Sequence, residues 1–369
     1  MAVDWAGVRS EFPALQGRTF LNTATFGQLA RCTSDAVARH FARRDELACA
    51  DFLEWFDDAD RIRESIARLI HCEADDVAFV QNASSGLAIL LSGIDWRAGD
   101  RVVILENEFP NHIYAASAPR EPAIEFVETP WERFYESINE RTRVVLMSTV
   151  NYTNGFRPPL AEISRYLRGR GVLFYLDGTQ SVGALEFDCA EIKPDLLAVH
   201  GYKWLLSPNG SAFLYVNPEV RKWLRPNVIG WRSDRDWRRV DSLNHGAPVF
   251  VDKAEKYEGG MLIFPMVYAM GASVGMMLEI GPREIEQRVL ALSALACEAL
   301  RSCGGTIVHE GSPIIAARFE RRDALVLARA LKEQRIQVSA RHGNLRVSVH
   351  FYNNEEDISR LAAALSSLF

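Results

Sequence analysis

Short apolar runs alternate with amphipathic stretches between residues 77 and 216. Six of the runs have the length and composition of strands, and they lie at 76–81, 100–106, 141–149, 171–178, 194–200 and 211–216. Several are apolar throughout, which is typical of a sheet covered on both faces, and helical stretches separate them. The pattern therefore predicts an α/β protein with a mainly parallel sheet. Ligands of such sheets gather at the carboxyl ends of the strands, so we look for chemistry there.

The regions on either side of this sheet carry different patterns. Residues 45–70 are amphipathic, and we expect one helix there, with its charged residues on a solvated face. After residue 261, long helical patterns alternate with short strands at 305–310, 313–320 and 344–351. This change predicts a second, smaller α+β domain.

The stretch from Met261 to Leu278 has no charged residue and has the length of a membrane span. It also contains Pro265 and several small residues, and no basic residue lies immediately beside it. We therefore expect a buried helix that links the two domains, and no membrane span. The same stretch contains GASVG, which matches the G-x-S-x-G motif of hydrolases. That motif needs a strand, a sharp turn and a helix, so within a helical run its small residues indicate close helix packing.

Composition and charge narrow the range of functions. A chain of 369 residues is longer than a single small domain usually is, which favours two domains. The net charge of -6 comes without a basic block, so we expect no binding to nucleic acid. The six cysteines form neither a CxxC motif nor a metal-binding spacing, which indicates reduced thiols in a cytoplasmic protein and no metal site. The N-terminus does not have the basic segment followed by an apolar segment that a secretion signal requires, so we expect no secretion.

Polar residues follow three of the predicted strands. The strand at 171–178 ends with Asp177 and is followed by Gln180, and the strand at 194–200 ends with His200 and is followed by Tyr202 and Lys203. The strand at 76–81 leads into a small, hydroxyl-rich turn that contains Ala83, Ser84 and Ser85 and opens an apolar helix. The carboxyl ends of neighbouring parallel strands converge in space, so we expect the three groups to meet.

Each of these features also has an ordinary explanation. Ser84 has the residue type of a helix N-cap, and Asp177 precedes a glycine as the first residue of a turn does. The aliphatic stem of Lys203 is long enough to carry its amine to the surface.

Taken together, the three groups match the needs of one cofactor. A helix N-terminus with small hydroxyl residues holds a phosphate through backbone N–H groups. A carboxylate at a strand end keeps a pyridine nitrogen protonated, and a lysine in an apolar loop has a lowered pKa and forms a Schiff base. These are the requirements of pyridoxal 5'-phosphate (PLP).

At these residues the chain resembles the class V aminotransferase family of fold-type I PLP-dependent enzymes. That family includes cysteine desulfurases, kynureninases and isopenicillin N epimerase-like proteins. The resemblance extends over nearly the whole chain and is most specific in YLDGTQSVGALEFD followed by KPDLLAVHGYKWLLSPNG, and in the tail LRVSVHFYNNEEDISRL.

The resemblance implies an architecture. An N-terminal segment spans residues 1–20, and a large PLP-binding domain with a mainly parallel seven-stranded sheet spans 21–255. A linker helix and a small C-terminal α+β domain span 256–369. The family also implies a homodimer that acts on a small amino acid.

Roles of single residues follow from the same resemblance. Lys203 is expected to bind PLP covalently and later to move protons, Asp177 to pair with the pyridine nitrogen, and Gln180 to bond the ring hydroxyl. The phosphate is expected to contact Ala83, Ser84, Ser85, His200 and Tyr202, and Phe109 to stack on the ring. Arg346 matches the arginine that grips the substrate carboxylate. The substrate or the ring is also expected to meet Asn22, Thr23, Asn151 and Tyr152.

Two departures from the family pattern matter. The loop before Arg346, VSARHGNLR, has no cysteine, so a cysteine desulfurase is disfavoured. Relatives often supply a threonine from a GTxN turn to the phosphate of the partner subunit, but this chain has Met261 and Ile263 in those places. Gly259 and Gly260 still offer backbone N–H groups there, so a phosphate site shared across a dimer stays open.

The resemblance implies an enzyme that acts through an external aldimine of an amino acid, with transamination as the first choice. Elimination from a sulfur-containing amino acid by a C–S lyase and epimerisation are the alternatives. The second base of an epimerase would be His112, Tyr152 or His342. A PLP-binding protein without turnover is the alternative outside enzymes. The sequence alone does not identify the substrate side chain.

Overall fold

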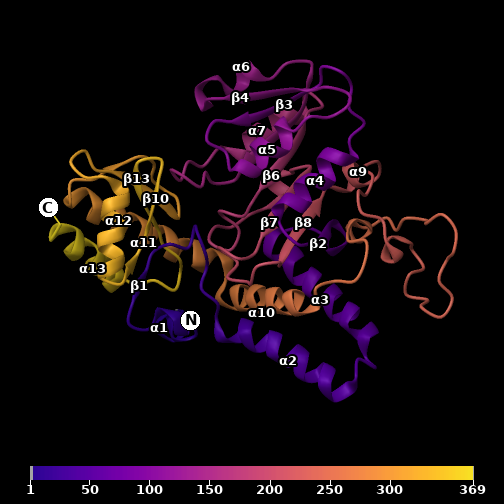
Figure 1. Ribbon diagram of the computed structural model, residues 1–369, viewed down its shortest axis with the longest axis horizontal. Coiled ribbons are helices and arrows are strands. Elements are labelled where there is room, and N and C mark those ends of the chain that lie inside the picture. Colours follow the sequence, from indigo (N-terminus) through magenta and orange to yellow (C-terminus); the bar gives the residue numbers. More distant parts are fainter. Residues whose placement is uncertain (1–2, 369) are drawn as a thin grey trace.

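The computed structural model describes residues 3–368, so Met1 and Ala2, at the start of the expected N-terminal segment, and Phe369 lie outside the described residues. A seven-stranded sheet forms its largest layer (Figure 1). Its strands, in spatial order, are β2 (Val77–Val80), β8 (Ala212–Val216), β7 (Leu196–His200), β6 (Leu173–Asp177), β5 (Thr142–Ser148), β3 (Arg101–Leu105) and β4 (Glu125–Thr129). Strand β8 is antiparallel to both neighbours and all other pairs are parallel. The predicted α/β class and mainly parallel sheet are confirmed.

Helices cover both faces of this sheet, which explains why its strands are apolar throughout. Alternate strand residues enter two separate cores, as the period of two in a strand requires. One core contains α4 (Ala83–Gly93) and α5 (Pro110–Ser117), and the other contains α3 (Phe52–Ile70), α7 (Leu160–Arg168) and α10 (Phe264–Ile280). Short helices in the connections are α6 (Phe134–Ser137), α8 (Cys189–Ile192) and α9 (Pro218–Arg221).

The single helix expected at residues 45–70 is wrong. Helix α2 (Arg31–Leu47) ends at the start of this stretch, and a separate helix, α3, begins at Phe52. Between them Ala48 and Cys49 adopt left-handed backbone angles, with φ of 48° and 62°, which end a right-handed helix. The chain turns there because α2 and α3 both pack against α10. An amphipathic pattern does not reveal such a reversal.

The charge-free stretch forms α10, as expected for a linker helix. Ser273 of the GASVG sequence is fully buried in the middle of this helix, and its hydroxyl donates to the carbonyl of Leu205. A nucleophile elbow is therefore excluded at this serine. Among the described residues no single helix is long and apolar enough to cross a membrane. Helix α10 reaches that length and hydropathy only together with α11 (Pro282–Ser302), from which it bends by 82°.

A second, antiparallel sheet lies beside the first (Figure 1). Its strands, in spatial order, are β12 (Ser339–Arg341), β13 (Asn344–Ser348), β10 (Ile314–Arg318) and β9 (Thr306–Ile307). This sheet shares a core with α11, α12 (Ala324–Glu333) and α13 (Glu355–Ser366). The domain limits expected from the sequence stay predictions.

The N-terminal segment ties the two sheets together. After α1 (Trp5–Ser10), strand β1 (Thr19–Phe20) pairs with β11 (Ile336–Gln337) on the C-terminal side. The chain then crosses to the loop after β7, where the Gly27 N–H donates to the carbonyl of Tyr202 at 2.9 Å. A Cβ atom on Gly27 would lie 1.9 Å from the carbonyl oxygen of Lys203, so only glycine allows this approach. The Lys203 loop is thereby held between the two sheets.

A buried carboxylate links three distant parts of the large layer. Glu258 accepts hydrogen bonds from Arg63 of α3 at 2.6 Å, from Arg232 at 2.8 Å and from the backbone N–H of Phe79 in β2 at 2.7 Å. All three charged side chains are almost completely buried. Burying them is tolerated because Glu258, together with Glu255, which also pairs with Arg232, balances the charges of the two arginines.

Replacing Glu258 tests this arrangement. Glu258→Ala leaves two buried arginines short of a carboxylate, and we expect a loss of about 3–5 kcal/mol of stability, measured as a lower midpoint of thermal unfolding. The matched control is Glu219→Ala, which removes an exposed ion pair with Lys222 and changes stability by less than about 1 kcal/mol. Equal midpoints for the two variants would contradict the role of Glu258.

Candidate active site

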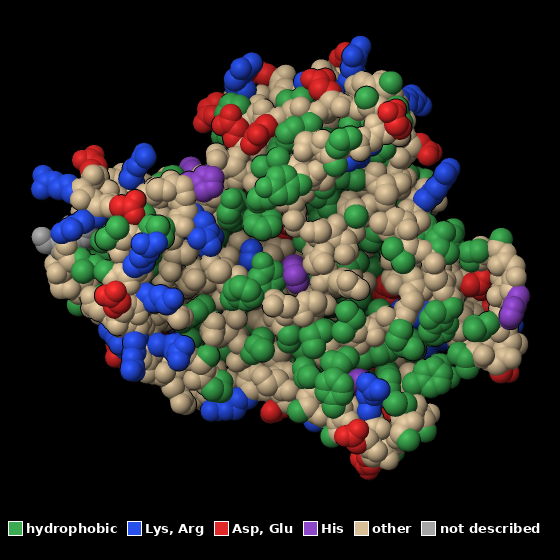
Figure 2. All heavy atoms as spheres, viewed as in Figure 1, with side chains coloured by type: hydrophobic (Ala, Val, Ile, Leu, Met, Phe, Trp, Pro, Cys, Tyr) green, Lys and Arg blue, Asp and Glu red, His purple; other side chains and the backbone are tan. Residues whose placement is uncertain are grey.

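The polar residues that follow the strands do meet at one edge of the large sheet. Ser148, Asp177 and Ala198 lie side by side at the carboxyl ends of β5, β6 and β7. His200 ends β7, and α4 begins directly after β2, which runs in the same direction as β7. Figure 2 shows basic and histidine side chains (blue and purple) where this part of the molecule meets the C-terminal sheet.

Lys203 lies in the loop after β7 and is 6% exposed. Its Nζ is 5.4 Å from the centre of the Phe109 ring and 5.3 Å from that of the Tyr202 ring. Burial lowers the pKa of Lys203 to about 7, although Asp177 opposes this shift; Arg346 and Arg341 lower the pKa further. A large fraction of this amine is therefore unprotonated and nucleophilic near neutral pH.

Asp177 is buried, and one of its oxygens is held by the chain. Oδ1 accepts the backbone N–H of Thr179 at 2.8 Å. Among the described residues no hydrogen bond reaches Oδ2, and the nearest charged group is Nε2 of His112 at 3.9 Å. This oxygen is thus available to a ligand.

Glu108 and His112 form a buried pair behind Asp177 that sequence reasoning did not find. Nδ1 of His112 lies 3.1 Å from Oε2 of Glu108, and Glu108 also accepts the backbone N–H and hydroxyl of Ser148. Burial opposes charge on both groups, but their mutual attraction raises the pKa of His112 and lowers that of Glu108. Glu108 precedes α5, whose N-cap is Phe109, and reaches His112 from outside the helix, so no helical spacing in the sequence indicated this pair.

Gln180, His200 and Tyr202 surround the same space. Gln180 donates to the carbonyl of Ala24 at 3.2 Å and accepts from the indole N–H of Trp204 at 2.9 Å, which fixes its amide. Burial lowers the pKa of His200 to about 4, so its ring is neutral, and its Nε2 has no hydrogen-bond partner among the described residues. The rings of His200 and Tyr202 lie 4.4 Å apart.

The N-cap of α4 is Asn82, and not Ser84 as the ordinary explanation of that serine requires. The side chain of Asn82 accepts the backbone N–H of Ser85 at 2.9 Å and lies 3.1 Å from its hydroxyl. Ser85 is therefore engaged within the turn. No acceptor within residues 3–368 takes the backbone N–H of Ala83 or Ser84, and Ser84 is exposed. These two N–H groups face outward from a helix N-terminus, which suits an anion.

Arg346 lies on β13 and is 1% exposed. It donates to Oγ of Ser339 at 3.0 Å, to the carbonyl of Tyr152 at 2.6 Å and to Oγ1 of Thr25 at 2.6 Å. None of these partners is charged, and burial lowers the pKa of Arg346 to about 9. A guanidinium without a carboxylate in such surroundings favours an anionic ligand.

Three of the other expected residues are held by the protein itself. The hydroxyl of Thr23 lies 2.7 Å from that of Tyr352, and both are buried, so Thr25 and not Thr23 contacts Arg346. Asn22 accepts from the hydroxyl of Thr25 at 2.8 Å. Asn151 donates to the carbonyl of Asn107 and accepts from Thr153, which closes its own loop. Sequence position alone does not show which way such short polar side chains turn.

Phe109 and Tyr152 form an aromatic wall beside Lys203. Their rings meet edge to face at 5.2 Å. Burial raises the pKa of Tyr152, although the charges of Arg341 and Arg346 oppose this. Tyr152 is therefore a hydrogen-bond donor near neutral pH.

These residues fit PLP. A buried amine with a low pKa suits a Schiff base, the free Oδ2 of Asp177 suits a protonated pyridine nitrogen, and the open N–H groups at α4 suit a phosphate. The unpartnered Nε2 of His200 offers one more polar contact. Within residues 3–368 no group of three or more His, Cys, Asp or Glu side chains is arranged to hold a metal ion.

Comparison with known proteins agrees with this chemistry. The model of the family "Aminotransferase class-V" matches residues 53–361. The aminotransferase YcbU of Bacillus subtilis, whose function is uncharacterised, is 28% identical over 362 residues, covering 95% of this chain and 94% of that protein. An isopenicillin N epimerase of Streptomyces clavuligerus is 28% identical over 407 residues, covering 100% of this chain and 99% of the epimerase. A probable cysteine desulfurase of Methanothermobacter thermautotrophicus is 25% identical over 396 residues, with 98% and 97% covered.

Solved structures share the fold. The cystine C–S lyase C-DES in complex with its product cysteine persulfide superimposes with a TM-score of 0.88 at 21% identity, covering 96% of this chain and 99% of the lyase. The cysteine desulfurase CsdA of Escherichia coli gives a TM-score of 0.86 at 19% identity, covering 100% and 98%. The family model spans most of the chain, so the chain belongs to the class-V aminotransferase family of fold-type I PLP-dependent enzymes.

Proposed function

We propose that this protein is a PLP-dependent enzyme that transfers the amino group of an amino acid. The observation that carries the proposal is Lys203, a buried lysine with a pKa lowered to about 7, beside the carboxylate of Asp177. A lysine without a covalent function is rarely buried in this way, because desolvating an ammonium costs free energy. Membership in the family supports the aminotransferase assignment.

The residues around Lys203 would hold the cofactor. Oδ2 of Asp177 would pair with the pyridine nitrogen, Gln180 would meet the ring hydroxyl, and Phe109 would pack on the ring. The N–H groups of Ala83 and Ser84 would hold the phosphate, with His200 and Tyr202 as further contacts. When bound, PLP supplies a ring that withdraws electrons from the substrate α-carbon.

The substrate is held by Arg346 and processed by Lys203. Arg346 offers a planar pair of donors to the α-carboxylate, and its neutral partners leave its charge uncompensated until substrate binds. Lys203, as a neutral amine, takes the α-proton and returns it during transfer. The wall of Phe109 and Tyr152 keeps water from this exchange.

The alternatives of the family are less well supported by the geometry. Epimerisation needs a second base, but His112 is buried against Glu108 and faces Asp177, and the raised pKa of Tyr152 keeps its hydroxyl protonated near neutral pH. His342 is exposed, and its ring centre lies 6.3 Å from that of Tyr152. Elimination from a sulfur-containing amino acid stays the second candidate, because C-DES shares the fold. A desulfurase is disfavoured, because the hairpin of β12 and β13 has no cysteine.

We also propose a homodimer of a cytoplasmic protein. All six cysteines are free, which supports a reducing compartment.

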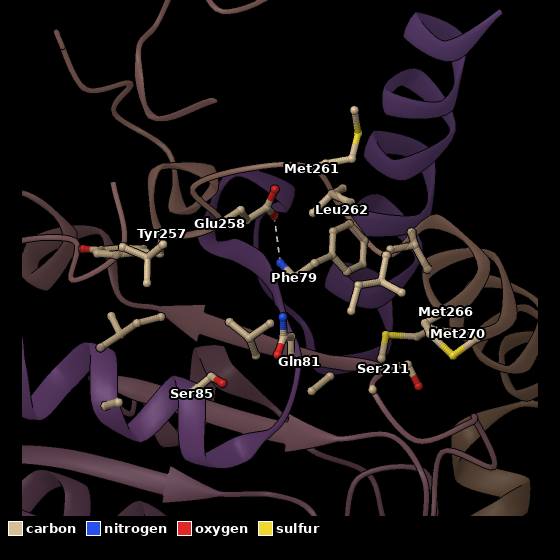
Figure 3. A pocket seen from close by; sticks show the side chains of 18 of the residues that line it. Phe79, Gln81, Ser85, Ser211, Tyr257, Glu258, Met261, Leu262, Met266 and Met270 are labelled. Atoms are coloured by element: carbon tan, nitrogen blue, oxygen red, sulfur yellow. Dashed lines mark hydrogen bonds between the residues drawn. The ribbon is translucent and has the colours of Figure 1, made fainter. Parts of the chain in front are cut away.

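Apolar side chains gather in the lower right of Figure 2, around α2 and the loop after α9, and this surface supports the dimer. Exposed members of this surface are Phe41, Leu47, Val228, Ile229, Met261 and Ile263. Met261 borders a cavity of about 310 Å³ that also contains Ser85, Met266 and Met270 (Figure 3), so a partner on this surface would lie beside the expected phosphate site.

Covalent attachment tests the role of Lys203. Borohydride reduction of the PLP-loaded protein is expected to fix the cofactor on the peptide that contains Lys203, which mass spectrometry identifies. Lys203→Ala removes the amine and is expected to abolish this label. Lys193→Ala, at the C-cap of α8 and away from the cofactor residues, is the control and keeps it. A label that stays at another lysine would contradict the proposal.

A panel of amino acids tests the reaction class. Transamination converts the amino acid to its keto acid without releasing ammonia, and it changes the visible absorbance of the loaded protein. Pyruvate together with sulfide and ammonia would instead establish elimination, and formation of the D-enantiomer would establish epimerisation. A yellow protein that no amino acid changes would indicate PLP binding without turnover.

The apolar surface predicts the oligomeric state. Met261 is 58% exposed, so Met261→Lys changes little within one subunit but places a charge in the proposed interface. We expect sedimentation or light scattering to give a dimer for the native protein and a larger share of monomer for this variant. Leu325→Lys, on α12 at the surface away from this region, is the control and stays dimeric. A monomeric native protein would contradict the proposal.

A further inference from the structure

We propose that Arg341 forms a second anion-binding position in the active site, and that the substrate is an amino acid with an acidic side chain. The inference rests on the proposed function, in which Arg346 holds the α-carboxylate. It adds a second positive group at a defined place, which selects among the amino acids that Arg346 alone would accept.

The register of the C-terminal hairpin places both arginines on one face. Ser339 of β12 pairs with Arg346 of β13, and their side chains are hydrogen-bonded at 3.0 Å. Arg341 lies two residues after Ser339 on the same strand, so its side chain projects from the same face. Residues in this diagonal relation lie about 7–8 Å apart, so two long side chains there can contact two groups of one small molecule.

Contacts connect this face to the reacting lysine. His342, next to Arg341, has its ring 6.3 Å from that of Tyr152, and Tyr152 meets Phe109 at 5.2 Å. Phe109 in turn lies 5.4 Å from Nζ of Lys203. The charge of Arg341 reaches the same groups, since it lowers the pKa of Lys203, Arg346 and Tyr152 alike. Arg341 therefore belongs to the cavity of the reaction and not to a distant surface.

The turn of the hairpin fixes Arg341 in place. His342 and Gly343 both have left-handed angles, with φ of 47° and 77°. Two such residues form the tight turn that joins antiparallel strands without splaying them. Arg341 and Asn344 are the paired residues on either side of this turn. The backbone of Arg341 is thus set by the hairpin before any ligand arrives.

The charges in this region do not balance. Arg341 is half-buried and donates to the carbonyl of Ala340 at 2.8 Å. Within residues 3–368, no carboxylate lies within 4.0 Å of a nitrogen of Arg341, Arg346 or Lys203. Asp177 is the acid that faces Lys203, and it is assigned to the cofactor ring. The guanidinium groups of Arg341 and Arg346 therefore have no carboxylate partner in the protein. A ligand with two carboxylates would supply one to each.

Kinetics of the holoenzyme test the proposal. We compare glutamate and aspartate with norvaline and alanine, which lack the second acid, in the native protein and in Arg341→Gln. We expect kcat/KM for the better acidic substrate to fall about 10- to 100-fold in the variant, as for the loss of a hydrogen bond to a charged group, and for the neutral substrates to change less than about threefold. Arg321→Gln, at an exposed position outside the cleft, is the control and leaves both values unchanged.

A binding measurement gives a readout that does not need turnover. Glutarate and pentanoate have the same length, but only glutarate has two carboxylates. Glutarate is expected to raise the thermal unfolding temperature of the cofactor-free native protein more than pentanoate does, and Arg341→Gln is expected to remove the difference.

Failure of this inference is distinguishable from failure of the proposed function. If neutral amino acids react as well as acidic ones and Arg341→Gln alters neither, the acidic-substrate inference is wrong while transamination stands. Equal stabilisation by glutarate and pentanoate would overturn it as well. If no amino acid reacts but glutarate still stabilises the native protein and not the variant, Arg341 binds an acid and the proposed transamination is what fails.

Discussion

The desolvation of one amine is the constraint on which the site depends. Lys203 lies between aromatic rings and is almost fully buried, and this environment favours its neutral form. Asp177 opposes the shift and keeps the pKa near 7 instead of lower. The same pair of residues thus sets two properties at once: an amine that is reactive near neutral pH, and a carboxylate with one oxygen free for a ring nitrogen. Either residue alone would give only one of them.

The fold explains how this environment is assembled from distant parts of the chain. Strand ends of the large sheet bring Asp177, His200 and the start of α4 to one edge. The second sheet brings Arg346 and Arg341 from the other side, and the N-terminal crossing between them contributes Thr25 and Gly27. Lys203 comes from the loop after β7, and Arg341 and Arg346 come from the hairpin of β12 and β13. The aromatic wall that separates them from water comes from the loops after β3 and β5.

Sequence reasoning found the parts of this site that are tied to strand ends or to a family motif. Asp177 and His200 terminate apolar runs, and Lys203 follows one. The pattern of apolar runs therefore predicted that these residues lie at the carboxyl edge of the sheet. Strand β4 was missed because it is an edge strand and only partly buried, which leaves no continuous apolar run. The break after Leu47 was missed because packing against α10, and not local propensity, turns the chain there. The Glu108–His112 pair and the contact of Thr25 with Arg346 depend on side-chain direction across separate elements, which a single sequence does not encode in any local signal.

The pKa of Lys203 in the cofactor-free protein decides whether this amine is desolvated as the proposed active site requires. Competitive labelling of lysines by a small acylating reagent, followed by mass spectrometry of each peptide across pH 5 to 11, gives the titration midpoint of this one amine. We expect a midpoint of about 7, well below the ordinary 10.5 of an exposed lysine. A midpoint near the ordinary value would mean that Lys203 is solvated, and the proposed active site would then have to be abandoned.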